Sequence, residues 1–279
     1  MSVKIIVDSA TDLFPTYEEE VIKIPMTLTF GEVEYKDGIT IDKNDFYKKL
    51  EEQELLPTTS QIPPMDFEKV FDQVSQAGDS AVVITTSSEL SGTWQNACIA
   101  AKDYPEIYVV DSLSASIGAG ILAEYAIQCV HQGMIAEELA VHLKEIRKMI
   151  RVIARLNTLE YLKKGGRISK TAAFAADILN IRPVLTIEEG QIIMLGKARG
   201  TKKANNILTQ KAEQEGIDFS RPVLLGYSGL SDALLQEYVE SSKKLWEGKT
   251  SKLDQTQLSS IIGTHAGPGA VAVAFFTKN

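Results

Sequence analysis

Short apolar runs that end in polar loops and precede helical periodicity recur in the first half of the chain. The runs occupy residues 3–7, 81–84 and 107–110, and the loops after them begin at Asp8, Thr85 and Asp111. Alternation of this kind is typical of βαβ units. Because the runs are apolar at nearly every position, they predict central strands of a parallel sheet that is covered on both faces.

Other elements of the first half follow from their own periodicity. Residues 21–35 form stretches of alternating apolar and polar residues that flank Gly31, which predicts extra strands or a hairpin. A charged helix is expected over residues 43–54. Leu139, Leu143, Ile146 and Ile150 recur at helical spacing, so residues 136–150 are expected to form one amphipathic helix.

The pattern changes after about residue 155, where hairpin-like segments replace the strand-loop-helix order. Residues 183–187 and 191–195 flank Glu188-Glu189-Gly190 and predict a hairpin, and residues 221–226 and 271–276 predict further strands, the last closing the sheet. We expect an α/β protein of two domains. Residues 1–155 would form a three-layer α/β domain with a mainly parallel sheet, and residues 156–279 an α+β domain with a mainly antiparallel sheet.

Composition limits the classes of partner and the compartment. The chain has 279 residues and a net charge of −8, which opposes binding to nucleic acid and allows at most transient contact with anionic membranes. Cys98 and Cys129 have no spacing typical of metal ligands or disulfides, so both are expected to be reduced and structural. No signal peptide and no apolar run near the ~20 residues needed to span a bilayer are recognised, so a cytoplasmic protein is expected.

The loop after the second apolar run carries a cluster of hydroxyl groups. Ser91, Gly92 and Thr93 lead into a helix expected over residues 94–101, whose N-terminus favours negative charge. Hydroxyl donors and a glycine that permits close approach predict an anion site. The alternative is that Ser88, Ser91 or Thr93 only caps the helix.

Two further segments carry similar chemistry. Thr58-Thr59-Ser60-Gln61 is expected to be a loop held by the prolines after it, and an ordinary turn before a helix over residues 65–76 is the alternative. Residues 263–269 are rich in glycine and include His265, which can hydrogen bond a carboxylate or orient a hydroxyl. A structural turn with an uninvolved histidine is the alternative there.

Basic residues form two smaller groups. Arg167 follows Gly165-Gly166 and is placed to reach an anion, whereas a solvated helix end is the ordinary alternative. Arg199 lies in a local basic patch that suits a phosphate-bearing partner or is only a solvated face. That patch consists of Lys197, Arg199, Lys202 and Lys203.

Known enzyme and metal signatures do not fit. The glycine pattern from Gly118 to Ala123 begins too far after its strand to hold a pyrophosphate. The residues from Gly190 to Lys197 depart from a phosphate-binding loop, and Ser228 misses the nucleophile elbow by one position. Histidines and acids lack ligand spacing, so no metal and no cofactor are expected.

Several segments together resemble the DegV family along essentially the whole chain. The segments that carry the resemblance are Val7-Asp8-Ser9-Ala10-Thr11-Asp12, Thr59-Ser60-Gln61, Leu90-Ser91-Gly92-Thr93, Asp111-Ser112, Leu159 through Ser169, and Gly263 through Gly269. Trp94 stands where the family pattern suggests tyrosine or phenylalanine, and Ile62-Pro63-Pro64 stands where it more often has Pro-Ser-Pro. Neither difference removes a proposed ligand-binding residue.

The resemblance implies that a long-chain fatty acid is bound between the two domains. It also implies a carrier subunit that presents the fatty acid to a separate ATP-dependent fatty acid kinase, which forms an acyl phosphate for phospholipid synthesis. By the same resemblance, the residues expected around the carboxylate are Thr59, Ser60, Ser91, Gly92, Thr93 and His265. Arg167 and Arg199 would face the kinase.

Two other functions remain open from the residues. One is a stand-alone enzyme on a small carboxylated or phosphorylated metabolite, with Ser91 as nucleophile and His265 as base. The other is an interaction module without a ligand, which predicts that the protein has no pocket.

Overall fold

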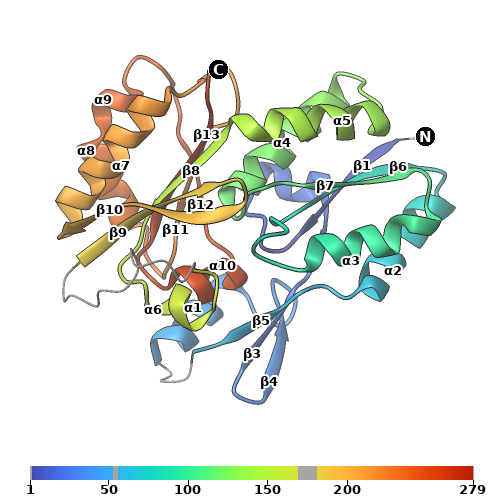
Figure 1. The fold of residues 1–279 in the computed structure, drawn as a ribbon, viewed down its shortest axis with the longest axis horizontal. Helices are drawn as coiled ribbons and strands as arrows, with labels where there is room; N and C mark the ends of the chain where they lie inside the picture. The colour runs from blue at the N-terminus through green and yellow to red at the C-terminus, as the bar shows by residue number, and fades with distance from the viewer. Residues whose placement is uncertain (1, 53–55, 169–180, 279) are drawn as a thin grey trace.

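A computed structural model describes residues 2–52, 56–168 and 181–278 of the chain. Figure 1 shows a parallel sheet and a larger, mainly antiparallel sheet side by side, with a third, small sheet below them. The expected mixed α/β class is therefore confirmed. The division of the chain at residue 155 stays a prediction.

The four-stranded sheet is parallel throughout and has the order β2-β1-β6-β7. Its strands are β1 (Val3–Asp8), β2 (Val21–Ile24), β6 (Ser80–Thr85) and β7 (Ile107–Asp111). The three strands predicted from the apolar runs are confirmed, and β2 comes from the segment before Gly31.

Alternate side chains of these strands pack into two separate cores. Ile5 and Val82 face α4 (Ile117–His131) and α5 (Ala136–Ile146), whereas Ile6 and Val83 face α2 (Pro64–Gln76) and α3 (Thr93–Ala100). Successive residues of a strand point to opposite faces, so a sheet covered on both faces must be apolar at every position.

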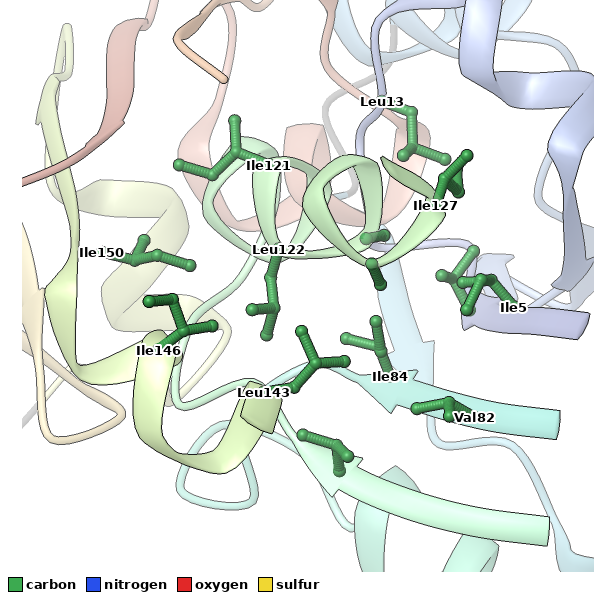
Figure 2. Packing of buried hydrophobic residues seen from close by; sticks show 14 of the residues in the cluster. Ile5, Leu13, Val82, Ile84, Ile121, Leu122, Ile127, Leu143, Ile146 and Ile150 are labelled. Atoms are coloured by element: carbon green, nitrogen blue, oxygen red, sulfur yellow. The ribbon is translucent and has the colours of Figure 1, made fainter. Parts of the chain in front are cut away.

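Helix α4 lies between the two large sheets. Leu122 contacts the core of the parallel sheet, as Figure 2 shows, and the same core includes Val152 and Phe276 from the larger sheet. Most residues of α4 are buried, as expected for a helix that is apolar around its whole circumference. The two sheets therefore share one continuous core.

The six-stranded sheet has the order β10-β9-β8-β13-β11-β12 and is antiparallel except where β11 pairs with β12. Its strands are β8 (Ile150–Arg155), β9 (Ile181–Glu188), β10 (Gln191–Arg199), β11 (Leu224–Tyr227), β12 (Asp254–Gln257) and β13 (Val271–Phe276). The last strand was expected to close the sheet, but β13 lies inside it, between β8 and β11. All six residues of β13 are buried, and an inner strand hides both of its faces and both of its edges.

Helices cover the outer face of this sheet, on the left of Figure 1. They are α7 (Thr201–Glu215), α8 (Ala233–Ser241) and α9 (Lys243–Trp246). Two short helices, α6 (Glu160–Lys164) and α10 (Ser260–Ala266), lie at the end of the sheet and contact each other.

The predicted hairpin is β9–β10. Its turn residues Glu189 and Gly190 both have positive φ, as a two-residue turn that matches the strand twist requires. The turn contacts the loop after β6, where the Ser87 hydroxyl donates to the carbonyl of Gly190 at 3.0 Å. This contact joins the larger sheet to the parallel one.

The third sheet has the order β4-β3-β5 and comprises β3 (Thr27–Phe30), β4 (Val33–Lys36) and β5 (Thr58–Ser60). The hairpin around Gly31 is confirmed as β3–β4. The expected loop at Thr58–Ser60 is wrong, because this segment pairs with β3 as a strand. The charged helix is α1 (Lys43–Glu52), and the end predicted for it at Glu54 lies outside the described residues.

The helix predicted over residues 136–150 is too long. Helix α5 ends at Ile146, a 3₁₀ turn (Arg147–Met149) follows, and Ile150 begins β8. Ile150 pairs with Phe276 of β13, so long-range strand pairing determines where the helix stops. Two further 3₁₀ turns are Pro15–Glu20 and Ala101–Asp103. Among the described residues, no helix combines the length and the apolar character needed to cross a membrane.

Candidate functional site

The loops after the parallel strands converge through buried carboxylates. Asp8, at the end of β1, accepts hydrogen bonds from the backbone N–H of Thr86 at 2.6 Å and from its hydroxyl at 3.0 Å. Asp8 is fully buried, and burial raises the pKa of its carboxyl group. The loops after β1 and β6 are thereby held together.

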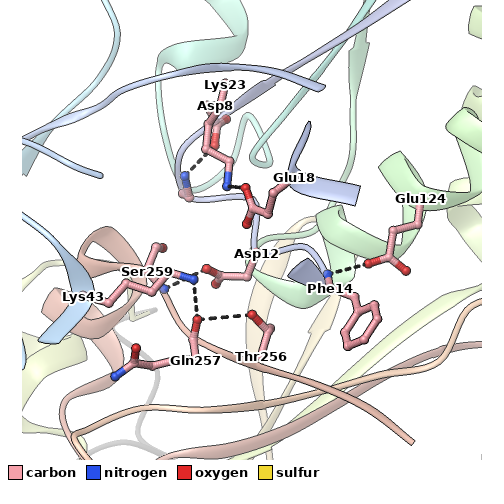
Figure 3. Close-up of polar contacts among 11 residues, drawn as sticks. Asp8, Asp12, Phe14, Glu18, Lys23, Lys43, Glu124, Thr256, Gln257 and Ser259 are labelled. Carbon is pink, nitrogen blue, oxygen red and sulfur yellow. Dashed lines mark hydrogen bonds and ion pairs between the residues drawn. The ribbon is translucent and has the colours of Figure 1, made fainter. Parts of the chain in front are cut away.

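Asp12 joins the same region to the C-terminal part of the chain, as Figure 3 shows. Its carboxylate accepts from the Ser116 hydroxyl and from the backbone N–H of Ser259, both at 2.7 Å. Burial raises the pKa of Asp12 to about 6, and nearby Lys43 opposes that rise. Because Ser259 is the N-cap of α10, Asp12 holds the start of that helix against the parallel sheet.

Helix α10 brings His265 to the small sheet. Its Nε2 lies 2.9 Å from the hydroxyl oxygen of Thr59 on β5. Burial, reinforced by the positive charge of Arg167, lowers the pKa of His265 to about 4. The imidazole is therefore neutral at pH 7.

The other ring nitrogen of His265 indicates which tautomer is present. Nδ1 is buried and has no partner in the part of the chain that the structure describes, and a Cβ added to Gly165 would lie only 2.2 Å from it. An N–H at Nδ1 would have no acceptor, so we assign the proton to Nε2, which then donates to Thr59. With that oxygen already accepting, the Thr59 hydroxyl can direct its own proton to a ligand.

Ser91 is arranged in a similar way. Its hydroxyl oxygen lies 2.9 Å from that of Thr93 and also accepts the backbone N–H of Thr93 at 3.3 Å. The Thr93 hydroxyl accepts from the N–H of Ile62 at 3.4 Å, so it can donate to Ser91. Ser91 then has its proton available. Thr93 is the first residue of α3, so the capping alternative for Ser91 is partly correct, although the N-cap position belongs to Gly92.

Gly92 allows the two hydroxyl segments to approach each other. A Cβ at this position would lie 1.9 Å from the side-chain oxygen of Gln61. Gln61 follows β5 directly, so its packing on Gly92 brings Thr59 and Ser91 to the same end of a cavity.

The cavity lies between the two large sheets and has about 1020 Å³ of empty space, including its open mouth. Most of its wall is apolar and comes from both halves of the chain. The apolar wall consists of Ala10, Met26, Leu90, Ala115, Val152, Ala154, Leu156, Leu162, Leu185, Ile187, Ile192, Leu258, Ile261, Ile262, Ala266, Ala270 and Ala272.

The polar residues of the cavity wall differ in whether their hydroxyl protons are available to a ligand. Thr86 and Ser116 donate their hydroxyls to Asp8 and Asp12, whereas Thr59 and Ser91 keep a donor free. The other polar lining residues are Gln61, Arg167, Thr186 and His265. An apolar cavity with donors at one end suits an amphipathic molecule that carries a negative head group.

The predicted site residues do not all reach this cavity. Ser60 is exposed, and Gly92 and Thr93 support the site from outside its wall. Arg167 lines the cavity and donates to the carbonyls of Leu90 at 3.1 Å and Gly165 at 2.7 Å. Arg199 is exposed at the end of β10, outside the cavity wall.

Sequence reasoning left Gln61 out of the expected carboxylate ligands and did not identify the apolar wall. A partial signal for the wall exists in the small side chains Ala154, Ala270 and Ala272 on or beside buried strands, because small residues leave space open. In the described ranges, no group of three His, Cys, Asp or Glu residues could hold a metal ion.

The fold and cavity define an α/β protein with a deep apolar cavity between two sheets and hydroxyl donors at one end. The chain belongs to the DegV family: residues 2–278 match the model of that family, described as "Uncharacterised protein, DegV family". The family assignment made from the sequence is confirmed.

Individual relatives agree over nearly the full chain. A fatty acid-binding protein of Thermotoga maritima is 33% identical over 280 residues, which cover 97% of this chain and 96% of the relative. The crystal structure of a DegV lipid binding protein from Thermotoga maritima has a TM-score of 0.88 and 30% identity, covering 100% of this chain and 99% of that one. A stearic acid-binding protein from Eubacterium ventriosum has a TM-score of 0.87 and 26% identity, with coverage of 100% and 99%.

Proposed function

We propose that this chain binds one long-chain fatty acid with its tail in the apolar cavity and its carboxylate at the hydroxyls of Thr59 and Ser91, with His265 completing that network through its hydrogen bond to Thr59. The observation that carries the proposal is a cavity of apolar side chains that ends in the hydroxyl groups of Thr59 and Ser91, to each of which we assign a proton free for a ligand. The fatty acid-binding relative from Thermotoga maritima and the stearic acid-binding relative support the choice of ligand.

The energetics of the cavity agree with this ligand. A buried tail of about 15 methylene groups contributes on the order of 10 kcal/mol, before the entropy of immobilising the chain is subtracted. Burying the carboxylate opposes binding unless donors surround it. Thr59 and Ser91 supply two hydroxyl donors. The tail therefore supplies most of the affinity, and the hydroxyls determine the orientation.

We further propose that the chain is a carrier that presents the carboxylate to a separate ATP-dependent kinase in the cytoplasm. Arg167 on the cavity wall and exposed Arg199 are the residues proposed to face that kinase. No metal or cofactor takes part in the carrier's own function. The net charge of −8 agrees with the proposal that the chain binds no nucleic acid and makes at most transient membrane contact.

The enzyme alternative has less support from the geometry. Within the described ranges, the Ser91 hydroxyl hydrogen bonds only to Thr93, and the His265 ring hydrogen bonds to Thr59 rather than to Ser91. A serine nucleophile requires a base within hydrogen-bond reach. The cavity itself is evidence against the alternative of an interaction module without a pocket.

The deciding experiment is denaturing organic extraction of the purified protein, followed by mass spectrometry of the extract. Close to one fatty acid per chain is expected. Protein stripped of lipid should then take up added stearate in a direct titration. If the stripped, folded protein takes up no fatty acid, the binding proposal is wrong.

The presentation step requires its own assay, in which the loaded chain is mixed with ATP and a fatty acid kinase. Acyl phosphate is expected only when both proteins are present. Turnover of an acyl ester or phosphate by the isolated chain, lost in Ser91→Ala, would support the enzyme alternative instead.

A further inference from the structure

A buried guanidinium lies on the far side of the cavity wall. Ala154 of β8 lines the cavity, so the next residue, Arg155, points to the opposite face of the sheet. Its backbone pairs with Val184 of β9 and Val271 of β13, and both of those side chains belong to the core under α7 and α8. Arg155 is 0% exposed.

The hydrogen bonds of Arg155 leave most of its donors unused. Nη1 donates to the side-chain oxygen of Asn157 at 3.3 Å, whereas Nε and Nη2 are buried and have no partner among the described residues. In the described part of the chain, no carboxylate forms an ion pair with this guanidinium. Nε and Nη2 lie along one edge of the planar group, the edge that binds two oxygens of an oxyanion.

A second arginine increases the local positive charge. Arg182 of β9 donates through Nη1 to the carbonyl of Asn157 at 2.7 Å, and its buried Nε also has no partner within residues 2–52, 56–168 and 181–278. Burial and the charge of Arg182 lower the pKa of Arg155 to about 10. Asn205 lies on the buried face of α7, which packs against β8, and neither side-chain amide atom has a partner in the described ranges.

A buried cation beside a half-buried one is unfavourable without a counter-ion, because burial removes hydration from Arg155 and Arg182 repels it. A bound dianion removes both costs. We propose that Arg155 and Arg182 form an oxyanion site for inorganic phosphate or a phosphate monoester, on the face of the six-stranded sheet opposite the acyl cavity. The unpaired donors of these two arginines, both of which hydrogen bond to Asn157, carry the proposal, which does not depend on fatty acid binding.

Glu237 is the competing counter-ion. It is an exposed residue of α8, and its charge raises the pKa of Arg155 without forming an ion pair. If Glu237 turned inward it would neutralise Arg155 and leave no place for phosphate. Glu237→Gln therefore separates the two cases, because it should strengthen phosphate binding if the site takes an external anion.

The test measures the melting temperature in inorganic phosphate and in chloride at equal ionic strength, together with calorimetric titration of phosphate. Phosphate should raise the melting temperature of the wild type by about 2–4 °C or more. Arg155→Met and Arg182→Gln should remove that rise and weaken phosphate binding by about tenfold or more. Lys202→Gln, which removes an exposed charge at the start of α7, is the matched control and should retain the rise.

The melting temperature in chloride, without phosphate, is an independent test of whether the buried charge of Arg155 is unpaired. Replacing an unpaired buried charge by an apolar side chain is neutral or stabilising, so Arg155→Met should melt at or above the wild type. Adenosine monophosphate and glycerol phosphate, titrated in parallel, distinguish free phosphate from a phosphate monoester. The proposal would be overturned if phosphate did not raise the melting temperature of the wild type, or raised that of Arg155→Met equally. It would also be overturned if Glu237→Gln abolished the rise.

Discussion

The imidazole of His265 and the hydroxyl of Thr59 are 206 positions apart in sequence and 2.9 Å apart in space. His265 lies on α10, which connects β12 and β13 of the six-stranded sheet. Thr59 lies on β5, the edge strand of the small three-stranded sheet. Both residues line the polar end of the cavity. The proposed carboxylate site therefore exists only when both parts of the chain are folded together.

Removing either free hydroxyl should weaken fatty acid binding without unfolding the protein. Thr59→Ala and Ser91→Ala each delete a donor to a charged oxygen, which contributes about 1.5–3 kcal/mol. The dissociation constant for stearate, measured by calorimetry, should rise about tenfold or more in each variant. Ser60→Ala removes the exposed neighbouring hydroxyl and should bind like wild type. Unchanged affinity in the Thr59→Ala, Ser91→Ala double variant would refute the assignment.

Gly165→Ala should displace His265. The added Cβ would lie 2.2 Å from Nδ1, so the ring must move away from Thr59. Stearate affinity should fall, and the NMR signals of the His265 ring should shift. Gly196→Ala is the control, because its Cβ would meet only Ile207 at an ordinary 3.4 Å. A Gly165→Ala variant with wild-type affinity and ring signals would show that the glycine is not needed there.

Enlarging a small side chain in the cavity wall should limit the length of the bound chain. Ala154→Leu adds three carbon atoms to the cavity, and overpacking of this kind costs about 1–3 kcal/mol when the site is filled. Extracted lipid should shift to shorter acyl chains or lower occupancy. Ala77→Leu, at an exposed helix end, is the matched control. The same lipid profile in Ala154→Leu and wild type would be inconsistent with a tail at this wall.

Glu124 should make the protein less stable as the pH rises. It is 3% exposed in α4, accepts one hydrogen bond from the Phe14 N–H at 2.8 Å (Figure 3), and burial raises its pKa from 4.5 to about 8. The folded state therefore holds this proton more tightly than the unfolded state. Its contribution to stability is complete below pH 4.5 and decreases by roughly 1.4 kcal/mol per unit toward pH 8.

Glu124→Gln should reduce that decrease, because glutamine keeps the acceptor for Phe14 and cannot ionise. Urea unfolding at pH 5 and pH 8 measures the effect. The variant should gain stability relative to wild type at pH 8 but not at pH 5. Glu89→Gln, on an exposed loop residue, controls for net charge. Equal pH dependence in Glu124→Gln and wild type would contradict the raised pKa.

Reversing the charge of Arg199 should affect the proposed kinase reaction and leave fatty acid binding unchanged. The side chain is exposed and outside the cavity wall, so Arg199→Glu cannot alter the tail or the carboxylate contacts. We expect acyl phosphate formation to slow by about tenfold, as for loss of a charged contact with a partner. Lys102→Glu, exposed on the other half of the molecule, should react normally. A normal rate in Arg199→Glu would remove this residue from the docking surface.

The sequence alone determined the elements whose pattern is local. Residues 3–7, 81–84 and 107–110 are apolar at nearly every position because both faces of β1, β6 and β7 are covered, so they were predictable. The β9–β10 hairpin was predictable from Glu189-Gly190 because its turn depends on backbone conformations that glycine readily adopts. The hydroxyl loops and the family motifs were visible in the same way.

Only the tertiary structure decided what depends on distant partners. Thr59 lies on a strand because β3 pairs with it. Helix α5 stops at Ile146 because β8, which follows after a 3₁₀ turn, pairs with β13. Strand β13 is an inner strand because β8 and β11 flank it. The cavity, the His265–Thr59 contact and the unpaired Arg155 likewise depend on side chains far apart in sequence. Local periodicity carries no information about such contacts, since they form only when the two large sheets pack around α4.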